Sequence, residues 1–145
     1  MTLARDPAPQ ARFQHALVVQ AAEIDANRHA NNIAYLRWVQ DAAVAHWLAA
    51  VEPELARGMS WVVVRHEIDY KQPAYLGDAL VVQTWIGAIT AATTERLCEI
   101  VRPADNQLLA RARTIWCALD PQTGRPRRID QRIREAFLAS PSSGA

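Results

Sequence analysis

The feature that most constrains the fold is a helix-forming stretch that is apolar on nearly every side. It begins at Asn31 or Asn32, whose side-chain oxygen can cap a helix by accepting a free backbone N–H. It runs to about Ala50, and Glu52-Pro53 ends it because proline cannot continue a helix. Its apolar side chains point in several directions: Ile33, Leu36, Val39, Ala43 and Trp47 on one side, and Tyr35, Trp38, Ala42 and Val44 elsewhere. A surface helix shows one apolar stripe, so this pattern predicts a helix wrapped by a sheet.

Five segments with the composition of β-strands accompany this helix. One lies within 13–23, and four follow the helix at 61–72, 78–89, 93–102 and 108–119. In the segment 61–72 the even positions form an apolar set that is expected to share one face: Val62, Val64, His66, Ile68 and Tyr70. A short helix is expected over 129–138. One strand, a long helix and four strands in mostly hairpin succession predict an α+β domain over 13–139, with flexible tails at 1–12 and 140–145.

The residues just before the helix have a spacing suited to catalysis. Asp25, Asn27 and His29 stand at alternate positions, and Asn31 and Asn32 follow at the helix start. They place a carboxylate, an amide and an imidazole ahead of backbone N–H groups that have no partner within the helix and can hold a developing negative charge. The arrangement indicates an active site.

This motif resembles one found in hotdog-fold thioesterases. The run Asp25-x-Asn27-x-His29-x-Asn31-Asn32-x-x-Tyr35-x-x-Trp38 is similar to the plant-type acyl-ACP thioesterase motif and, less closely, to those of the 4-hydroxybenzoyl-CoA and long-chain acyl-CoA thioesterases. The segment 70–78 resembles the one that leaves the second strand of single-domain members. The resemblance implies a single hotdog domain, an antiparallel five-stranded sheet wrapped around a long central helix, in subunits that form at least dimers.

The resemblance also assigns roles to the motif residues. Asp25 is expected to be the nucleophile or general base, with an Asx-turn or helix-entry carboxylate as the structural alternative. Asn27 would orient Asp25 or hold the thioester carbonyl, and His29 would exchange a proton with the attacking water, although a loop histidine is usually only solvated. The backbone N–H of Asn31 or Asn32 is expected to bind the oxyanion, whereas simple helix capping is the alternative.

Two departures from the family pattern leave the second catalytic acid unidentified. No acidic residue stands near Pro73, where the plant-type enzymes have one, and Gln40 occupies the helix position at which many acyl-CoA relatives carry an acid. His66 could approach the site, but a core or interface histidine is the more common case. Five arginines are candidates for phosphate contacts at a CoA entrance, with solvated surface charge as the default: Arg111, Arg113, Arg125, Arg127 and Arg128.

The predicted function is hydrolysis of an acyl-CoA, or of an acyl carrier protein thioester, to free acid and thiol. Two alternatives stay open: a hotdog dehydratase or hydratase acting on acyl chains, and a subunit that binds acyl thioesters without catalysis. Chain length, aromatic or aliphatic preference, and pathway are not encoded in the spacing of these residues.

The composition of the chain limits the classes of partner that it is expected to bind. With 16 basic and 15 acidic side chains there is no bulk charge to attract nucleic acid or a membrane surface. No apolar run is long enough to span a bilayer and no signal peptide is recognisable, which predicts a cytoplasmic protein. Cys98 and Cys117 lack metal-site spacing and are expected to be packed thiols. No metal or cofactor motif is present, and a homodimer or homotetramer is expected from the resemblance.

Overall fold

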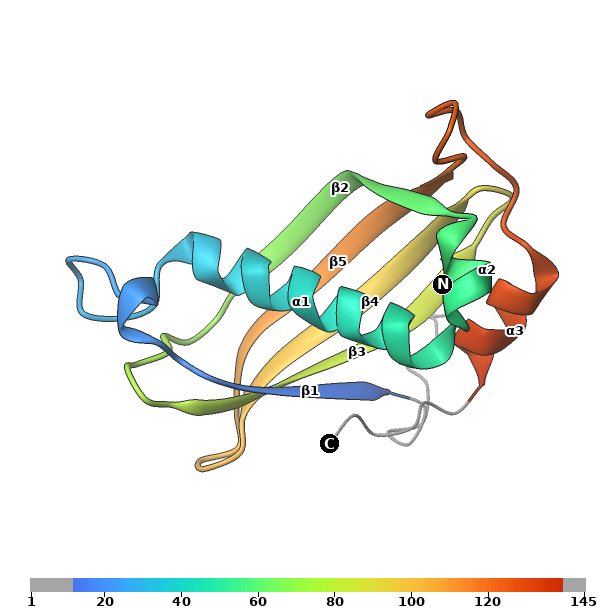
Figure 1. Ribbon diagram of the computed structural model, residues 1–145. Coiled ribbons are helices and arrows are strands. Elements are labelled where there is room, and N and C mark those ends of the chain that lie inside the picture. Colours follow the sequence, from blue (N-terminus) through green and yellow to red (C-terminus); the bar gives the residue numbers. More distant parts are fainter. Residues whose placement is uncertain (1–11, 140–145) are drawn as a thin grey trace, which may run out of the picture.

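The computed structural model describes residues 12–139, so the expected tails at 1–12 and 140–145 lie outside the described residues except for Arg12. Within this range one antiparallel sheet has the strand order β1-β3-β4-β5-β2. The strands are β1 (Phe13–Val18), β2 (Ser60–Tyr70), β3 (Ala79–Ile89), β4 (Thr93–Arg102) and β5 (Gln107–Leu119). The long helix α1 (Asn32–Ala50) lies in the concave face of this sheet (Figure 1). The predicted α+β architecture is confirmed.

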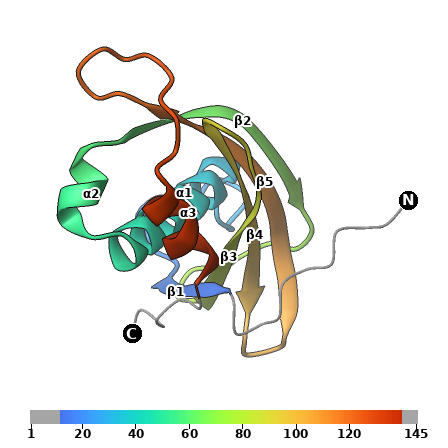
Figure 2. The same ribbon diagram turned by 90° about the vertical axis from the view of Figure 1, so that its right-hand side faces the viewer.

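Short helices complete the domain at its two ends. A 3-10 turn, Ala21–Glu23, leads into the loop before α1. The helices α2 (Pro53–Arg57) and α3 (Gln131–Leu138) lie together at the end where α1 finishes, as the view along the helix shows (Figure 2). The helix α1 ends at Ala50, before Pro53. Pro53 is instead the first residue of α2, because proline is well tolerated in the first turn of a helix.

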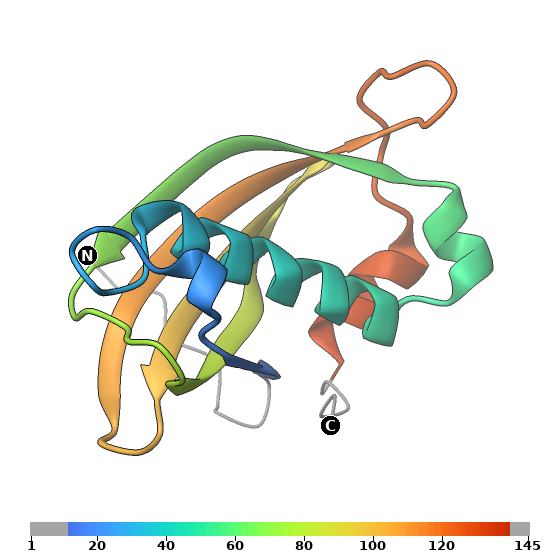
Figure 3. The same cartoon turned by 60° about the vertical axis from the view of Figure 1, so that its left-hand side comes forward.

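Strand β2 occupies an edge of the sheet. It pairs with β5, while β3 pairs with β1 and β4. The strands β3, β4 and β5 follow one another as hairpins, but the segment 71–78 carries the chain from β2 to the opposite part of the sheet (Figure 3). Gly77 allows the turn in this segment, since its φ of 82° is unfavourable for residues with a Cβ.

The expected face of β2 is wrong for its first half. The register with β5 shifts between Val63 and Arg65, which is a β-bulge. One extra residue reverses the alternation of side chains. His66, Ile68 and Tyr70 therefore face α1 as predicted, but Val64 is 64% exposed, and Trp61 packs against Trp47 of α1 at 5.5 Å between ring centroids.

The sheet covers α1 on one side only. The buried residues of the helix form one stripe: Ala34, Tyr35, Trp38, Val39, Ala42, Ala43 and His46. The opposite side keeps apolar side chains in solvent, and Ile33 and Leu48 are 72% and 69% exposed. The sheet therefore wraps one side of α1, and the described residues 12–139 leave its other apolar side uncovered.

Two apolar clusters divide the interior along α1. One surrounds the first half of the helix and includes Tyr35, Trp38 and Leu80. The other joins the end of α1 to α3 through Val51, Ile133 and other residues. Both cysteines are free thiols; Cys98 is buried, which raises the pKa of its thiol to about 11, and Cys117 is partly buried.

Candidate active site

The loop before α1 is a closed turn. Ile24 and Ala30 form an antiparallel bridge across its base, and the Asp25 N–H donates to the His29 carbonyl at 3.1 Å. The turn is closed by the Arg28 N–H, which donates to the Asp25 carbonyl at 3.0 Å. Arg28 has a φ of 68°. A left-handed conformation costs a residue with a side chain about 1 to 2 kcal/mol, so the surrounding bonds hold this loop in a defined shape.

The side chain of Asp25 is part of this turn. Its Oδ1 accepts the backbone N–H of Asn27 at 2.8 Å, which is an Asx-turn. The carboxylate is half-buried, and its other oxygen has no hydrogen-bond donor among residues 12–139. Asn27 itself is exposed. The structural alternative considered for Asp25 is therefore present, and it fixes one carboxylate oxygen while leaving the other available.

The two asparagines at the helix start have different surroundings. Asn31 is the N-cap residue, and its Oδ1 accepts the N–H of Ala34 at 2.8 Å. The N–H of Asn31 donates to the Glu23 carbonyl at 2.9 Å and is thereby occupied. The N–H of Asn32, the first residue of α1, has no acceptor in the described part of the chain. Of the two predicted oxyanion donors, only the amide of Asn32 is unpaired.

Glu23 connects the loop, the helix and the first strand. Its carboxylate accepts the Trp38 indole N–H at 2.7 Å and the backbone N–H of Gln20 at 2.8 Å, and its carbonyl holds Asn31. The sequence signal for this residue is a capping box, formed by Gln20 and Glu23 three positions apart. Sequence reasoning did not assign Glu23 a role; the structure shows that it positions the start of α1.

Two tyrosines join the helix start to the segment after β2. The Tyr35 hydroxyl donates to the Gln72 carbonyl at 3.1 Å and accepts the Ala74 N–H at 2.9 Å. The Tyr70 hydroxyl donates to the Asn32 carbonyl at 3.0 Å. Burial raises the pKa of both phenols, so both remain protonated donors at neutral pH. The two sequence motifs, 25–38 and 70–78, thus meet at one place.

A cavity lies where the two motifs meet. Its volume is about 280 Å³, close to the lower end of the range for small-molecule sites. The lining comes from the helix start and from the segment after β2: His29, Ala30, Asn32, Tyr35, Tyr70, Lys71, Gln72 and Pro73. Two of the five predicted site residues, His29 and Asn32, therefore share this cavity. Asp25, Asn27 and Asn31 belong to the adjoining loop and cap and do not line it.

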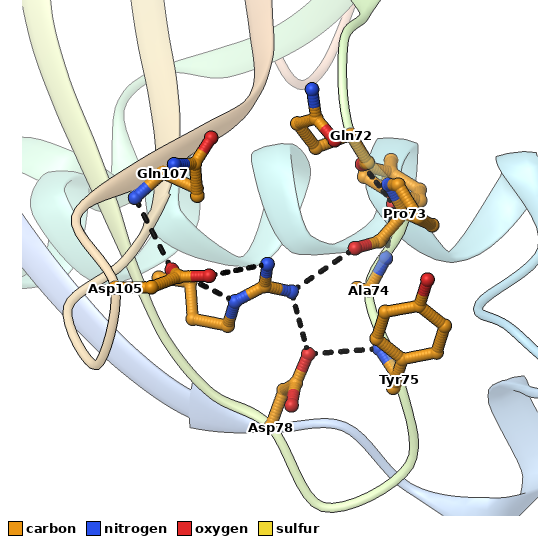
Figure 4. Close-up of polar contacts among 9 residues, drawn as sticks. Gln72, Pro73, Ala74, Tyr75, Asp78, Asp105 and Gln107 are labelled. Carbon is orange, nitrogen blue, oxygen red and sulfur yellow. Dashed lines mark hydrogen bonds and ion pairs between the residues drawn. The ribbon is translucent and has the colours of Figure 1, made fainter.

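An arginine fixes the far wall of the cavity. Figure 4 shows Asp78, Asp105 and the Pro73 carbonyl around one guanidinium, which belongs to Arg102. Arg102 donates to these groups at 3.1 Å for Pro73, 3.0 Å for Asp78 and 2.9 Å for Asp105 Oδ2. Asp78 also accepts the N–H of Tyr75 at 2.9 Å. The turn between β4 and β5 is thus tied to the segment that follows Gln72.

The other residues considered from the sequence lie away from this cavity. His66 contacts Thr114 at 2.8 Å between Nδ1 and Oγ1. Arg111 pairs with Glu99 at 3.2 Å, and Arg113 donates to Glu95 at 2.5 Å, both on the sheet face turned away from α1. The basic residue that does line the cavity is Lys71, which sequence reasoning did not single out.

Residues 12–139 contain neither a candidate metal cluster nor a candidate membrane-spanning helix. The His, Cys, Asp and Glu side chains of this range form no cluster of three or more that could hold a metal ion. In the same range, no helix combines the length and the apolar character required to cross a membrane.

Comparisons with known proteins give a consistent result. The profile of the thioesterase-like superfamily matches residues 19–137. The palmitoyl-acyl carrier protein thioesterase of Gossypium hirsutum is 23% identical over 131 aligned residues, covering 84% of this chain but 32% of that protein, so the chain spans about a third of its length. The long-chain acyl-CoA thioesterase FadM of Escherichia coli is also 23% identical, over 128 residues that cover 85% of this chain and 95% of that protein. Slr0204, a 1,4-dihydroxy-2-naphthoyl-CoA thioesterase from Synechocystis, has the same fold with a TM-score of 0.77 at 22% identity, covering 87% of this chain and 95% of that structure.

Proposed function

The chain belongs to the thioesterase-like superfamily, and from that premise we propose that it hydrolyses acyl-CoA thioesters at the start of α1. The products are a carboxylic acid and a free thiol. The name of FadM specifies a long-chain acyl-CoA, which supports CoA as the thiol carrier. The name of the Gossypium relative specifies an acyl carrier protein, so that carrier is the second candidate.

The observation that carries this proposal is the unpaired N–H of Asn32 at the cavity. A helix start concentrates partial positive charge, and a free amide there stabilises a negative oxygen. Asn32 lines the cavity together with His29, while its carbonyl is fixed by Tyr70. A thioester carbonyl in the cavity would direct its oxygen to this N–H. Donors of this kind lower the barrier of acyl transfer by about 3 to 4 kcal/mol.

Asp25 is our candidate for the nucleophile or general base. Its Oδ1 is held by Asn27, and its other oxygen has no donor within the described range, so one lone pair is available to a water or a carbonyl carbon. The loop is closed at Ile24 and Ala30, which keeps Asp25 and His29 in one rigid turn. Because Asp25 does not line the cavity, we propose that it acts through a water at the cavity edge or after substrate binding tightens the site.

The reaction then needs two bond changes. As general base, Asp25 takes one proton from water while the hydroxide forms a bond to the carbonyl carbon, and the oxyanion is held by the Asn32 N–H. The tetrahedral intermediate collapses, the carbon–sulfur bond breaks, and the thiolate takes a proton. His29 can exchange a proton with the water, and Asn27 orients the carboxylate through its backbone N–H. If Asp25 acts as nucleophile, water releases the acid from an anhydride in a second step.

Lys71 is the basic residue best placed for the CoA moiety. It lines the cavity, is exposed, and forms no ion pair with the acidic side chains of residues 12–139. An ammonium group at a cavity rim favours a phosphate ester without requiring fixed geometry. We therefore propose that Lys71 contacts a CoA phosphate, and that Lys71→Met raises KM with little change in kcat.

We also propose that the protein forms a homo-oligomer, at least a dimer, through the β2 edge and the uncovered side of α1. Strand β2 pairs only with β5 among the described strands, and its side chains Val62 and Val64 are exposed. Ile33 and Leu48 of α1 are exposed as well. An unpaired strand edge flanked by apolar residues favours pairing with a second chain. Measuring the molecular mass of the wild type and of Val64→Asp in solution tests this proposal. A wild type that is monomeric at micromolar concentration contradicts it.

The experiment that tests the proposed activity measures free thiol from a panel of aliphatic and aromatic acyl-CoAs. Asp25→Asn and Asp25→Ala are expected to lose about a hundredfold or more of kcat, because the base or nucleophile is removed. Glu54→Gln is the matched control, since Glu54 is an exposed carboxylate on α2 and lies outside the cavity lining. Unchanged turnover in folded Asp25 variants would end the assignment.

The same panel of acyl-CoAs distinguishes a hydrolase from the two alternatives, a dehydratase or hydratase and a non-catalytic binding subunit. A dehydratase or hydratase would add water to an enoyl-CoA, which absorbance of the conjugated thioester reports directly, and it would release no thiol. A binding subunit would show saturable acyl-CoA binding without thiol release at any chain length. Either result would replace the hydrolase proposal.

A further inference from the structure

A second cavity lies beside the other half of α1. It is bounded by α1, α3 and the strands β2, β4 and β5, and its walls are largely aromatic. The residues that define it are Trp47, Trp61, Thr94, Arg96, Trp116 and Phe137. The volume is about 70 Å³, room for roughly five waters or, at about 30 Å³ of liquid per water, for a molecule of about 150 Å³. A single aromatic ring with one substituent has this size.

Arg96 carries a positive charge in this cavity without an acidic partner. It is only 4% exposed. Its Nη1 donates to His46 Nδ1 at 2.9 Å and to Thr84 Oγ1 at 3.0 Å, both neutral acceptors. Its Nε and Nη2 have no acceptor, and no carboxylate pairs with it, within residues 12–139. A buried charge without a counter-ion costs several kcal/mol, so this guanidinium is a strong site for an anion.

The remaining unpaired groups around the cavity are also donors. His46 accepts from Arg96 at Nδ1, so its proton is on Nε2, which is buried and has no acceptor among the described residues. The indole nitrogens of Trp61 and Trp116 are likewise buried without an acceptor in that range. The region therefore has a surplus of hydrogen-bond donors. A ligand that brings acceptors and an apolar body complements it.

We propose that this cavity binds a small organic carboxylate with an aromatic or short aliphatic body, its carboxylate paired with Arg96. The aromatic rings of Trp47, Trp61 and Phe137 pack against one another, with centroids 5.5 to 6.3 Å apart, and give the body of the ligand an apolar wall. An inorganic anion would not use these apolar walls, and a neutral molecule would leave the charge unpaired. The cavity is separate from the thioesterase site: Ala43 lies about 16 Å along the helix axis from Asn32, given the rise per residue.

The test records the indole N–H signals of ¹⁵N-labelled full-length protein by NMR while benzoate is added at neutral pH. The signals of Trp61 and Trp116 are expected to shift in a saturable manner. Trp85 is an internal control, because its indole is also buried without an acceptor but stacks with Arg12, at 3.8 Å, and lies outside the cavity lining. Benzyl alcohol, a neutral analogue, is expected to bind at least about tenfold more weakly because it cannot pair with the guanidinium.

A variant then assigns the charge. Arg96→Met keeps an unbranched apolar stem without the guanidinium and should reduce benzoate affinity at least about tenfold while leaving benzyl alcohol affinity unchanged within about threefold. Arg125→Met, in the exposed turn after β5, is the matched control and should bind benzoate as the wild type does. Hexanoate shows whether the body must be aromatic. Absence of a saturable shift, equal binding of benzoate and benzyl alcohol, or full benzoate affinity in Arg96→Met would each overturn the proposal; the first two use only the wild type.

Discussion

The two halves of α1 hold two cavities that differ in how their polar groups are satisfied. At the first half, the hydroxyls of Tyr35 and Tyr70 are paired with backbone groups, and the cavity is lined by Asn32, whose backbone N–H has no acceptor among residues 12–139. At the second half, Trp61 and Trp116 line the cavity together with Arg96, and several donors lack acceptors in the described chain. In our proposals, the first cavity stabilises a charge that forms during a reaction, and the second binds a charge that a ligand brings.

The difference follows from burial. A free amide at a half-open helix start costs little, because water can reach it until substrate enters. A guanidinium that is 4% exposed has no such solvent, and its charge is expensive unless an anion joins it. Variants in each half of α1 can test this difference.

The largest effect is expected from removing the Asn32 N–H itself. Asn32→Pro deletes that hydrogen at the first helical position, where proline is well tolerated, and the φ of −71° and ψ of 160° at Asn31 suit a residue before proline. We expect the barrier to acyl-CoA hydrolysis to rise by about 3 to 4 kcal/mol, which lowers kcat a few hundredfold. Asn32→Ala is the control, since it removes the side chain and keeps the N–H. Equal activity of the two variants would show that this amide is not the oxyanion donor.

The next effect is a pH dependence that arises from His46 in the second half. Burial, followed by the charge of Arg96, lowers the pKa of His46 to about 3 from an ordinary 6.5. As the pH falls below about 6.5, the unfolded chain takes up a proton that the folded chain refuses, so stability is lost down to about pH 3. Between about pH 7 and pH 4.5, the free energy of unfolding is expected to fall by about 2 to 3 kcal/mol.

His46→Gln removes this titration and retains an acceptor for Arg96. Urea unfolding at the two pH values should show a smaller stability difference for the variant than for the wild type, by about that amount. An identical difference in both proteins would mean that His46 titrates normally in the folded state.

A smaller effect is expected at the junction of the two motifs. Tyr35→Phe leaves the buried N–H of Ala74 without its partner, which should lower the free energy of unfolding by about 1 to 2 kcal/mol. Tyr70→Phe is the comparison, because Tyr70 is 43% exposed and water can replace its bond to Asn32, so its loss should stay below about 1 kcal/mol. Denaturant unfolding of both variants measures this, and a reversed order would contradict the roles given to the two hydroxyls.

The sequence predicted the helices and strands better than it predicted which of them pair with one another. The apolar helix, its cap at Asn31 and the strand segments follow from local patterns, and the structure confirms them. The bulge at Val64 and the place of β2 at the sheet edge depend on pairing between distant strands, which a single sequence does not display. The pattern of valines in β2 therefore suggested the wrong face for its first half.

The candidate site shows the same limit. The motif 25–38 places Asp25, His29 and Asn32 near the helix start, but it does not distinguish the amide of Asn31 from that of Asn32. That choice depends on the Glu23 carbonyl, which accepts the former. Arg96 gave no sequence signal, because its neighbours His46 and Thr84 come from α1 and β3 and meet it only through the register of the sheet.

The most direct measurement of the central claim is a crystal structure with an acyl-CoA analogue in which a methylene group replaces the thioester sulfur. This ketone keeps the carbonyl and cannot be hydrolysed. We expect its carbonyl oxygen to lie within about 3 Å of the Asn32 backbone nitrogen, with the carboxylate of Asp25 or a water bound to it facing the carbonyl carbon. A carbonyl bound elsewhere, with the Asn32 amide still unpaired, would contradict it.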